Sequence, residues 1–348
     1  MHFAQNINME KNLFRTPIYF PKAEKLIETK DNILFIGSCF ADNMGKFMEE
    51  ARFQVMVNPF GVLYNPASIA WTIESLLKPF DANELEFEFC NGLWHSFFYH
   101  GKFSHPIQEE TISYINKKTV ETRLFLKKTD FLVLTFGTSY VYEHKEKMFI
   151  VANCHKFDAS LFNRYMLEPE EIIEKYTDLI VNLRVFNPTL KIILTVSPVR
   201  HLKDGAHGNQ ISKSVLLLAL EKIVNRFENV TYFPAYEVVM DELRDYRFYS
   251  SDMIQPNEVA IKYIWEKFVN TYFSNEAIDF NRQVQKIIKA RNHRLPGFIT
   301  ENSVKFINNA LKYTELLMSK YPNTLLEQDR IYFINLLTKI NGICNFQQ

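Results

Sequence analysis

The sequence predicts an α/β protein built on a parallel sheet that carries helices on both faces. Short apolar runs rich in β-branched and aromatic residues alternate along the chain with amphipathic stretches of helical length. Runs of this kind are typical of strands buried on both faces, and their alternation with helices is typical of a parallel sheet. The predicted strands are Ile33–Ile36, Phe53–Val57, Phe131–Phe136, Ile192–Val196 and Val230–Phe233.

The helices predicted between the strands are amphipathic and lie where crossover connections are needed. One of them ends before Asn187-Pro188, because the residue that precedes a proline disfavours helical geometry. A further helix, Val259–Phe268, follows the last strand. The crossover helices are predicted at Ala41–Ala51, Pro169–Phe186 and Asn209–Phe227.

Two segments depart from the alternation. Residues 80–115 contain turn and loop signals, and we interpret them as an insertion near the site. The aromatic segment Tyr140–Cys154 is typical of a β-hairpin that turns at about Glu143–Lys147.

From about Ala277 onward the chain is helical, rich in Asn and Lys, and without a strand signal. We therefore predict one domain over residues 1–276 and a helical extension over residues 277–348. We expect the extension to be a helical cap or an oligomerisation element, and an assembly role for the whole protein is one alternative. Its predicted helices are Gln283–Ala290, Asn302–Met318 and Leu325–Lys339.

Composition excludes several classes of function. The 348 residues are 47% hydrophobic, and 40 basic residues balance 40 acidic ones without a block of either sign. This balance argues against a basic nucleic-acid-binding face and against a polybasic membrane anchor. The sequence shows no signal peptide, no apolar run of membrane-spanning length and no Cys-x-x-Cys pair. We expect a cytoplasmic protein with no metal, no other cofactor, no nucleic-acid partner and no membrane span.

Polar and glycine residues follow four of the predicted strands. In a parallel sheet the carboxyl ends of the strands share one edge, and ligands bind in the crevice beyond it. We therefore expect these residues to lie near one another. The four segments are Gly37-Ser38, Asn58-Pro59-Phe60-Gly61, Gly137-Thr138-Ser139 and Ser197-Pro198-Val199-Arg200-His201.

Ser38 is the candidate nucleophile. It follows a buried strand and precedes a helix, so the helix dipole and the free N–H groups there favour negative charge on a reacting oxygen. The backbone N–H groups of Ser38 and Gly61 are candidate oxyanion donors. Ser38 as a helix N-cap and Gly61 as a turn residue are the structural alternatives. Cys39 is a rival nucleophile, although an inert buried thiol is the commoner role.

The motifs in this chain resemble those of the GSCFA family. The run Gly37-Ser38-Cys39-Phe40-Ala41 spells the family signature, and further matching segments follow in order over most of residues 12–270. They are Asn58–Pro66, Thr135–Thr138, Asn153–Lys156, Ser197–His201 and Asp241–Tyr249.

The GSCFA family in turn resembles the SGNH (GDSL-like) esterase superfamily. This resemblance implies a three-layer α/β/α fold with a flavodoxin-like sheet, and hydrolysis of an acyl or acetyl ester by a serine without a metal. It places Ser38 at the nucleophile and Gly61 at the oxyanion glycine. The superfamily's usual Gly-x-Asn is Gly137-Thr138-Ser139 here, so Ser139 could offer only a hydroxyl, and Asn153 is the proposed replacement amide.

The last block of the superfamily, Asp-x-x-His, departs from the pattern in this chain. Asp252 is present, but Gln255 occupies the histidine position, and an amide cannot accept the serine proton near neutral pH. His201 is the best replacement base, because it follows a strand at the same sheet edge. His100, His155 and His207 are weaker candidates. Arg200 is expected to bind a substrate carboxylate or phosphate, or to pair with an acid such as Asp204.

The function predicted from the sequence is therefore an SGNH-like serine hydrolase that acts on a small-molecule or carbohydrate ester. Three alternatives remain open at this point. The hydrolase could be slow, it could transfer the acyl group to a sugar or another alcohol, or it could be a pseudoenzyme that binds an ester or glycan without turnover.

Overall fold

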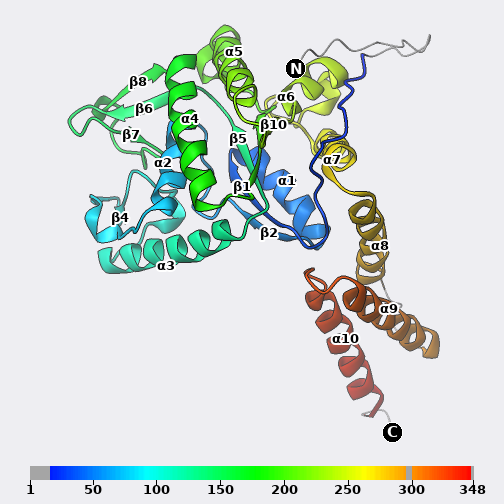
Figure 1. The fold of residues 1–348 in the computed structure, drawn as a ribbon. Helices are drawn as coiled ribbons and strands as arrows, with labels where there is room; N and C mark the ends of the chain where they lie inside the picture. The colour runs from blue at the N-terminus through cyan, green and yellow to red at the C-terminus, as the bar shows by residue number, and fades with distance from the viewer. Residues whose placement is uncertain (1–15, 295–299, 346–348) are drawn as a thin grey trace. The chain divides into compact units, whose positions relative to one another are not determined.

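The computed structural model describes residues 16–294 and 300–345. Its centre is a sheet of five strands in the order β10-β9-β5-β1-β2 (Figure 1). Each of the five predicted strands is confirmed to within two residues at either end. The observed bounds are β1 (Asn32–Gly37), β2 (Gln54–Val57), β5 (Phe131–Phe136), β9 (Lys191–Val196) and β10 (Val230–Tyr232).

Strands β1, β5, β9 and β10 pair in parallel, which confirms the predicted parallel sheet. In chain order the five strands follow the flavodoxin-like arrangement, in which the first and third strands are neighbours. After β2 the chain crosses to the other side of β1, and the remaining strands are added in that direction. The point between β1 and β5 is therefore the switch point of the sheet. A ligand crevice is expected at the carboxyl ends of these two strands.

Helices lie on both sides of the sheet, as predicted, and Figure 1 shows α1 and α4 on opposite sides of the strands. Helix α2, which the sequence analysis did not predict, begins with Asn65 as its N-cap and Pro66 in its first turn. The helices that belong to the sheet domain are α1 (Cys39–Glu50), α2 (Pro66–Leu77), α3 (Gln108–Lys127), α4 (Pro169–Phe186), α5 (Gly205–Val224), α6 (Ala235–Glu237) and α7 (Glu258–Tyr272).

The hydrophobic core on one side of the sheet explains why these strands form. Leu34 and Ile36 of β1 pack in one cluster with Leu132 and Leu134 of β5 and with side chains of α2 to α5. The alternate β1 residues, Ile33 and Phe35, are fully buried as well. A strand whose two faces are both buried must be apolar throughout, which is the pattern that the sequence shows.

The region between β2 and β5 differs from the prediction at its end. Residues 108–115 form the first turns of α3 rather than loop. Three of the inward-facing positions of α3 are threonines, namely Thr111, Thr119 and Thr122, so the apolar periodicity of the helix is weak in the sequence. The rest of the region holds a hairpin of β3 (Glu88–Cys90) and β4 (Leu93–His95).

The predicted hairpin about residues 143–147 is confirmed. Strand β6 (Tyr140–His144) pairs antiparallel with β7 (Ile150–Val151) and with β8 (Phe162–Met166), which makes a small sheet of three strands. This small sheet follows β5 in the chain.

The chain divides into two compact units. Among the described residues, the larger holds 16–20, 33–45 and 56–267, and it contains the sheet's carboxyl edge. The second combines residues 21–32 and 46–55 with the described residues of 268–345. Its helices are α8 (Asn275–Arg291), α9 (Glu301–Lys320) and α10 (Glu327–Asn345), which confirms the helical prediction for this part of the chain.

Within the second unit, a buried ion pair joins segments far apart in sequence. Arg52 donates from Nε and Nη2 to the two carboxylate oxygens of Asp329, at 2.5 and 2.8 Å, and Arg291 donates to Asp329 at 3.0 Å. The predicted boundary near Ala277 stays a prediction. None of the described helices is long and apolar enough to cross a membrane.

The end of β1 is held unusually close to β5. Gly37 has a φ of +147°, and a Cβ built on it would lie 2.2 Å from the carbonyl oxygen of Thr135. No side chain can occupy that space, so only glycine allows the chain to leave β1 at this point.

We predict that Gly37→Ala destabilises the protein by at least about 3 kcal/mol, because it adds a backbone clash to an unfavourable φ. Gly92→Ala is the matched control: its φ is +79° and its Cβ would meet nothing within 4 Å. We expect that control to lose only about 1 kcal/mol. Denaturant unfolding measures both, and equal losses would contradict the account.

Candidate active site

Ser38 lies directly after β1, at the point where α1 begins. It is completely buried, its N–H donates to the carbonyl of Thr135 at 3.0 Å, and its Oγ accepts from the N–H of Phe40 at 3.3 Å. The expected strand–turn–helix placement is therefore present, and so is the N-cap contact that was its structural alternative. The N–H of Ser38 is occupied and does not point free into a crevice.

Residues 58–65 form a loop that ties the carboxyl ends of β1 and β5 together. Leu63 donates its N–H to the carbonyl of Gly37 at 2.9 Å, and Gly137 donates its N–H to the carbonyl of Tyr64 at 2.8 Å. The buried side chain of Asn58 accepts from the N–H of Gly37 at 2.8 Å and donates to Asp42 at 2.6 Å. The segment Asn58–Pro66, which matches a GSCFA motif, therefore holds the ends of β1 and β5 together beside Ser38.

Gly137 separates Ser38 from His201. A Cβ built on Gly137 would lie 3.5 Å from the Cβ of Ser38 and 3.2 Å from Nε2 of His201. Ser38 and His201 therefore flank the same glycine, and the assignment of His201 as the base for Ser38 stays a prediction. Nε2 of His201 is buried and has no hydrogen-bond partner within the described chain. The Tyr64 ring meets the imidazole edge-on, with ring centroids 5.9 Å apart.

Burial is the main reason why the pKa of His201 is lowered to about 4. The charge of Lys213 lowers it further, Asp204 opposes this effect, and Arg164 adds a smaller lowering. The imidazole is therefore neutral at neutral pH, with a lone pair available to accept a proton.

Cys39 is poorly suited to be the nucleophile. Burial raises the pKa of its thiol, and the nearby charge of Asp42 raises it further. The thiol consequently stays protonated near neutral pH, whereas the thiolate is the reactive form.

Lys213 is a site residue that the sequence analysis missed. It belongs to α5 and is 1% exposed, and its Nζ donates to the carbonyls of Gly137 and Ser197 at 2.6 and 2.7 Å. Burial lowers the pKa of this lysine to about 7. A lysine on an amphipathic helix is normally solvated, so no sequence signal distinguishes this one from the others.

Two of the three other predicted oxyanion donors, those of Gly61 and Ser139, already donate to protein acceptors. The N–H of Gly61 donates to the carbonyl of Asn58 at 2.8 Å. The hydroxyl of Ser139 donates to Oγ of Ser212 at 3.1 Å, and Oδ1 of Asn153 accepts from the N–H of His155 at 2.9 Å. Within the described residues, neither Ser139 nor Asn153 hydrogen-bonds to Ser38. Their assignment to the oxyanion hole stays a prediction without a contact in support.

Asp252 and Gln255 lie on an exposed turn. Oδ1 of Asp252 accepts from the N–H groups of Ile254 and Gln255 at 2.9 and 3.0 Å, and these two bonds lower the pKa of its carboxyl. Among the described residues, neither side chain hydrogen-bonds to Ser38 or His201. The turn is attached to the sheet edge by the N–H of Arg200, which donates to the carbonyl of Ile254 at 3.2 Å.

Arg200 does not form the expected pair with Asp204. Asp204 is instead paired with Arg164 of β8. Nε of Arg200 is buried and has no hydrogen-bond partner in the described part of the chain. Its positive charge lowers the pKa of Tyr236 and of Tyr249 against the larger raising effect of burial on both.

The weaker histidine candidates are not placed against Gly137, although the side chain of His100 packs on Gly61. His155 donates from Nε2 to the carbonyl of Ser96 at 2.9 Å and packs on His95, with ring centroids 4.5 Å apart. His100 accepts from the N–H of Lys102 through Nδ1, and His207 is exposed on α5. Of the four histidines considered, His201 is the one that the structure places against Gly137 and Ser38.

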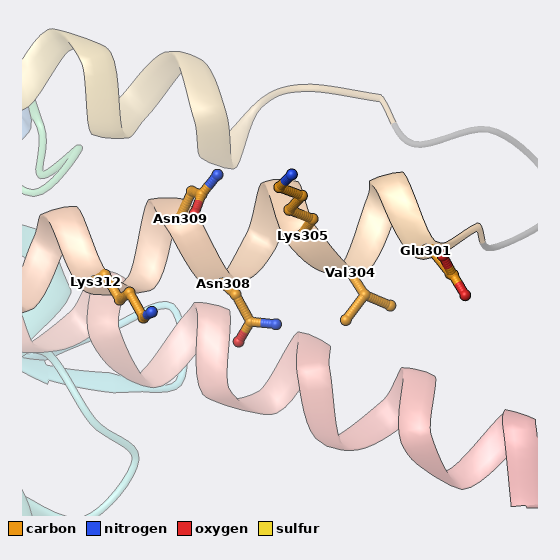
Figure 2. A pocket seen from close by; sticks show the side chains of 6 residues that line it. All are labelled: Glu301, Val304, Lys305, Asn308, Asn309 and Lys312. Atoms are coloured by element: carbon orange, nitrogen blue, oxygen red, sulfur yellow. The ribbon is translucent and has the colours of Figure 1, made fainter.

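A hollow beside α9 is not an alternative active site. Figure 2 shows that Lys305 and Asn309 point to one side of the helix while Val304 and Asn308 point to the other, so the side chains do not converge. The hollow holds no serine, cysteine or histidine. Its lining residues are Glu301, Val304, Lys305, Asn308, Asn309 and Lys312.

The fold and the site define a doubly wound α/β protein with a buried serine at the switch point of its sheet. The model of the GSCFA family matches residues 32–268, and the chain belongs to that family. No curated protein matches it.

Two solved esterase structures are similar to this chain at low identity. One is a carbohydrate esterase family 3 protein from Talaromyces cellulolyticus, at 9% identity and a TM-score of 0.32 over 74% of this chain and 99% of that one. The other is an acetyl xylan esterase from the rumen bacterium Butyrivibrio proteoclasticus, at 10% identity and a TM-score of 0.38 over 70% of this chain and 64% of that one.

We predict that His155 makes the protein acid-sensitive. Burial lowers its pKa to about 4, so between that pH and its ordinary pKa of about 6.5 the unfolded chain binds more protons. The free energy of unfolding should therefore fall by about 3 kcal/mol as the pH drops through this window.

Urea unfolding at a series of pH values measures this effect. His155→Gln should flatten the dependence, leaving the contribution of His201, while His207→Gln, at an exposed histidine, should leave it unchanged. A His155→Gln protein with the wild-type pH dependence would contradict the prediction.

Proposed function

We propose that this GSCFA protein is an SGNH-like serine hydrolase that acts on an acyl or acetyl ester, with Ser38 as nucleophile and His201 as general base. The observation that carries the proposal is the buried Nε2 of His201. It has no hydrogen-bond partner among the described residues, and it faces Gly137, which Ser38 adjoins. A buried polar atom without a hydrogen-bond partner lowers the stability of the folded protein by roughly 1–3 kcal/mol. We infer that His201 is kept beside the serine because its free Nε2 has a function.

In the proposed reaction, His201 Nε2 accepts the proton of the Ser38 hydroxyl while Oγ attacks the carbonyl carbon of the ester. The tetrahedral intermediate collapses, the alcohol leaves with the proton from His201, and the acyl group remains on Ser38. Water, activated by the same imidazole, then releases the acid and restores the serine. An alcohol in place of water would make the protein an acyltransferase.

The N-terminus of α1 supports the charge that develops on the carbonyl oxygen. The first N–H groups of a helix have no acceptor within the helix, and Cys39 is the first residue of α1. We assign the N–H of Cys39 as an oxyanion donor, which is the role of the residue after the nucleophile in serine hydrolases with a similar turn. The helix dipole adds to this stabilisation.

The complete burial of Ser38 sets a condition on this mechanism. A substrate reaches Oγ only if side chains above it move. Tyr64 is 43% exposed and its ring meets His201, so its side chain is the one that we expect to swing aside. Such gating motions are common in enzymes.

Labelling with a fluorophosphonate tests the proposal without knowledge of the substrate. We expect stoichiometric labelling of the wild type on the peptide that contains Ser38, none in Ser38→Ala, and unchanged labelling in Cys39→Ser. His201→Gln should slow the reaction by about 100-fold, the typical loss for a general base. An unlabelled wild type, or labelling that survives in Ser38→Ala, would overturn the assignment.

We also predict that Gly137→Ala blocks the reaction while the protein stays folded. Its Cβ would lie 3.1 Å from the Tyr64 carbonyl oxygen and 3.2 Å from Nε2 of His201, distances that require shifts of a few tenths of an ångström, and in ordinary contact with Ser38. Misplacement of this kind should lower the labelling rate by about 10- to 100-fold.

Gly101→Ala is the control for Gly137→Ala, because its Cβ would meet only His155, at 3.9 Å. The fluorophosphonate labelling rates and the thermal unfolding of both variants show whether Gly137→Ala lowers reactivity without unfolding the protein. A Gly137→Ala variant that is labelled as fast as the wild type would show that His201 and Ser38 do not act across this glycine.

The second candidate function is a pseudoenzyme that binds an ester or glycan without turnover. The exposed position of Gln255 and the burial of Ser38 favour it. Ligand binding measured by calorimetry, together with an unlabelled wild type, would support this function over hydrolysis.

A further inference from the structure

Lys213 is buried more completely than a lysine normally is. Its side chain lies under the turns that follow β5 and β9, and among the described residues no carboxylate forms an ion pair with it. Its contacts are two backbone carbonyls and, at 5.6 Å from Nζ, the ring of Tyr236 in α6. A buried ammonium without a counter-ion is costly, and a methionine would fill similar space without that cost.

The two carbonyls connect Lys213 to the candidate active site. Gly137, whose carbonyl accepts at 2.6 Å, is the residue that separates Ser38 from His201. Ser197, whose carbonyl accepts at 2.7 Å, begins the segment that leads to His201. Lys213 therefore hydrogen-bonds to both turns, and its positive charge when protonated lowers the pKa of His201.

We infer that Lys213 is a positioning residue of this site, which holds the two turns that place His201 and whose positive charge opposes protonation of that imidazole. The inference deepens the proposed function and rests on it, because protonation of His201 is a step of the proposed reaction. It makes His201 a weaker base than the histidine of a triad, where an adjacent carboxylate stabilises the imidazolium.

Other charges around both residues fit this role. Asp204, on the turn after His201, favours the imidazolium, but Arg164 of β8 pairs with Asp204 and lowers the pKa of His201 itself. On the side of α1, Cys39 is the titratable group that interacts with Lys213. Tyr64, from the loop after β2, faces His201 with its ring. Asp204 is therefore the carboxylate that opposes Lys213 at His201, and its own pairing with Arg164 brings a second positive charge near the imidazole.

The test measures the pKa of His201 by NMR in protein with labelled histidine, with the resonance assigned through His201→Gln. In the wild type we expect His201 to titrate below pH 5. Lys213→Gln removes the charge but keeps N–H donors for the two carbonyls. It should raise the pKa of His201 by about 1. The acid limb of the Ser38 labelling rate should move to higher pH by the same amount.

Lys222→Gln is the matched control, because it removes an exposed lysine from the same helix and should leave the pKa of His201 unchanged. Lys213→Met removes both charge and donors, so it should raise the pKa as Lys213→Gln does and lower the stability more. A purely structural role predicts the stability loss without the pKa change.

Two outcomes would overturn the inference. One is an unchanged pKa of His201 in a folded Lys213→Gln protein. The other, which needs no variant, is a wild-type His201 that titrates at or above 6.5, the ordinary value of histidine. Because the titration does not depend on turnover, an unlabelled Ser38 would defeat the proposed function while leaving the titration result to stand on its own.

Discussion

The close approach of β1 to β5 at Gly37 is the constraint on which the site depends. The missing side chain lets the chain leave β1 against the Thr135 carbonyl, so that Ser38 enters α1 fully buried. The same approach lets residues 58–65 bridge the two strand ends through Gly37 and Gly137. A side chain at Gly37 would separate the strands, and the serine would lose both its hydrogen bond to β5 and its position next to Gly137.

Positive potential around Ser38 has two opposing consequences. The N-terminus of α1 and the ammonium of Lys213 both favour negative charge on an oxygen bound there. The same potential disfavours the imidazolium that His201 must become when it takes the serine proton. A site arranged in this way stabilises an oxyanion better than it activates a hydroxyl. This balance fits a slow hydrolase, which is one of the alternatives that the sequence left open.

The sequence predicted the sheet well because strands buried on both faces must be apolar, and such runs are visible without a structure. The sequence did not predict α3, because three of its buried positions are threonines and the apolar pattern of a helix is therefore weak there. For the candidate site, the positions of Ser38 and His201 after neighbouring strands could be predicted because strand ends are visible in the sequence, whereas their catalytic roles stay predictions. Lys213 was not predicted, because the residues around a lysine on a helix do not show whether its side chain is buried or solvated. The sequence also does not show that the N–H groups of Ser38 and Gly61 already donate to backbone carbonyls, because these hydrogen bonds depend on the folded structure.

The most direct test of the central claim is a crystal structure of the protein with a phosphonate bound covalently to Ser38. The account predicts that Nε2 of His201 lies about 3 Å from an oxygen of the adduct, with Tyr64 displaced and a phosphonate oxygen directed at the N–H of Cys39. An adduct in which His201 faces away while Gln255 or another histidine contacts the phosphonate would contradict it.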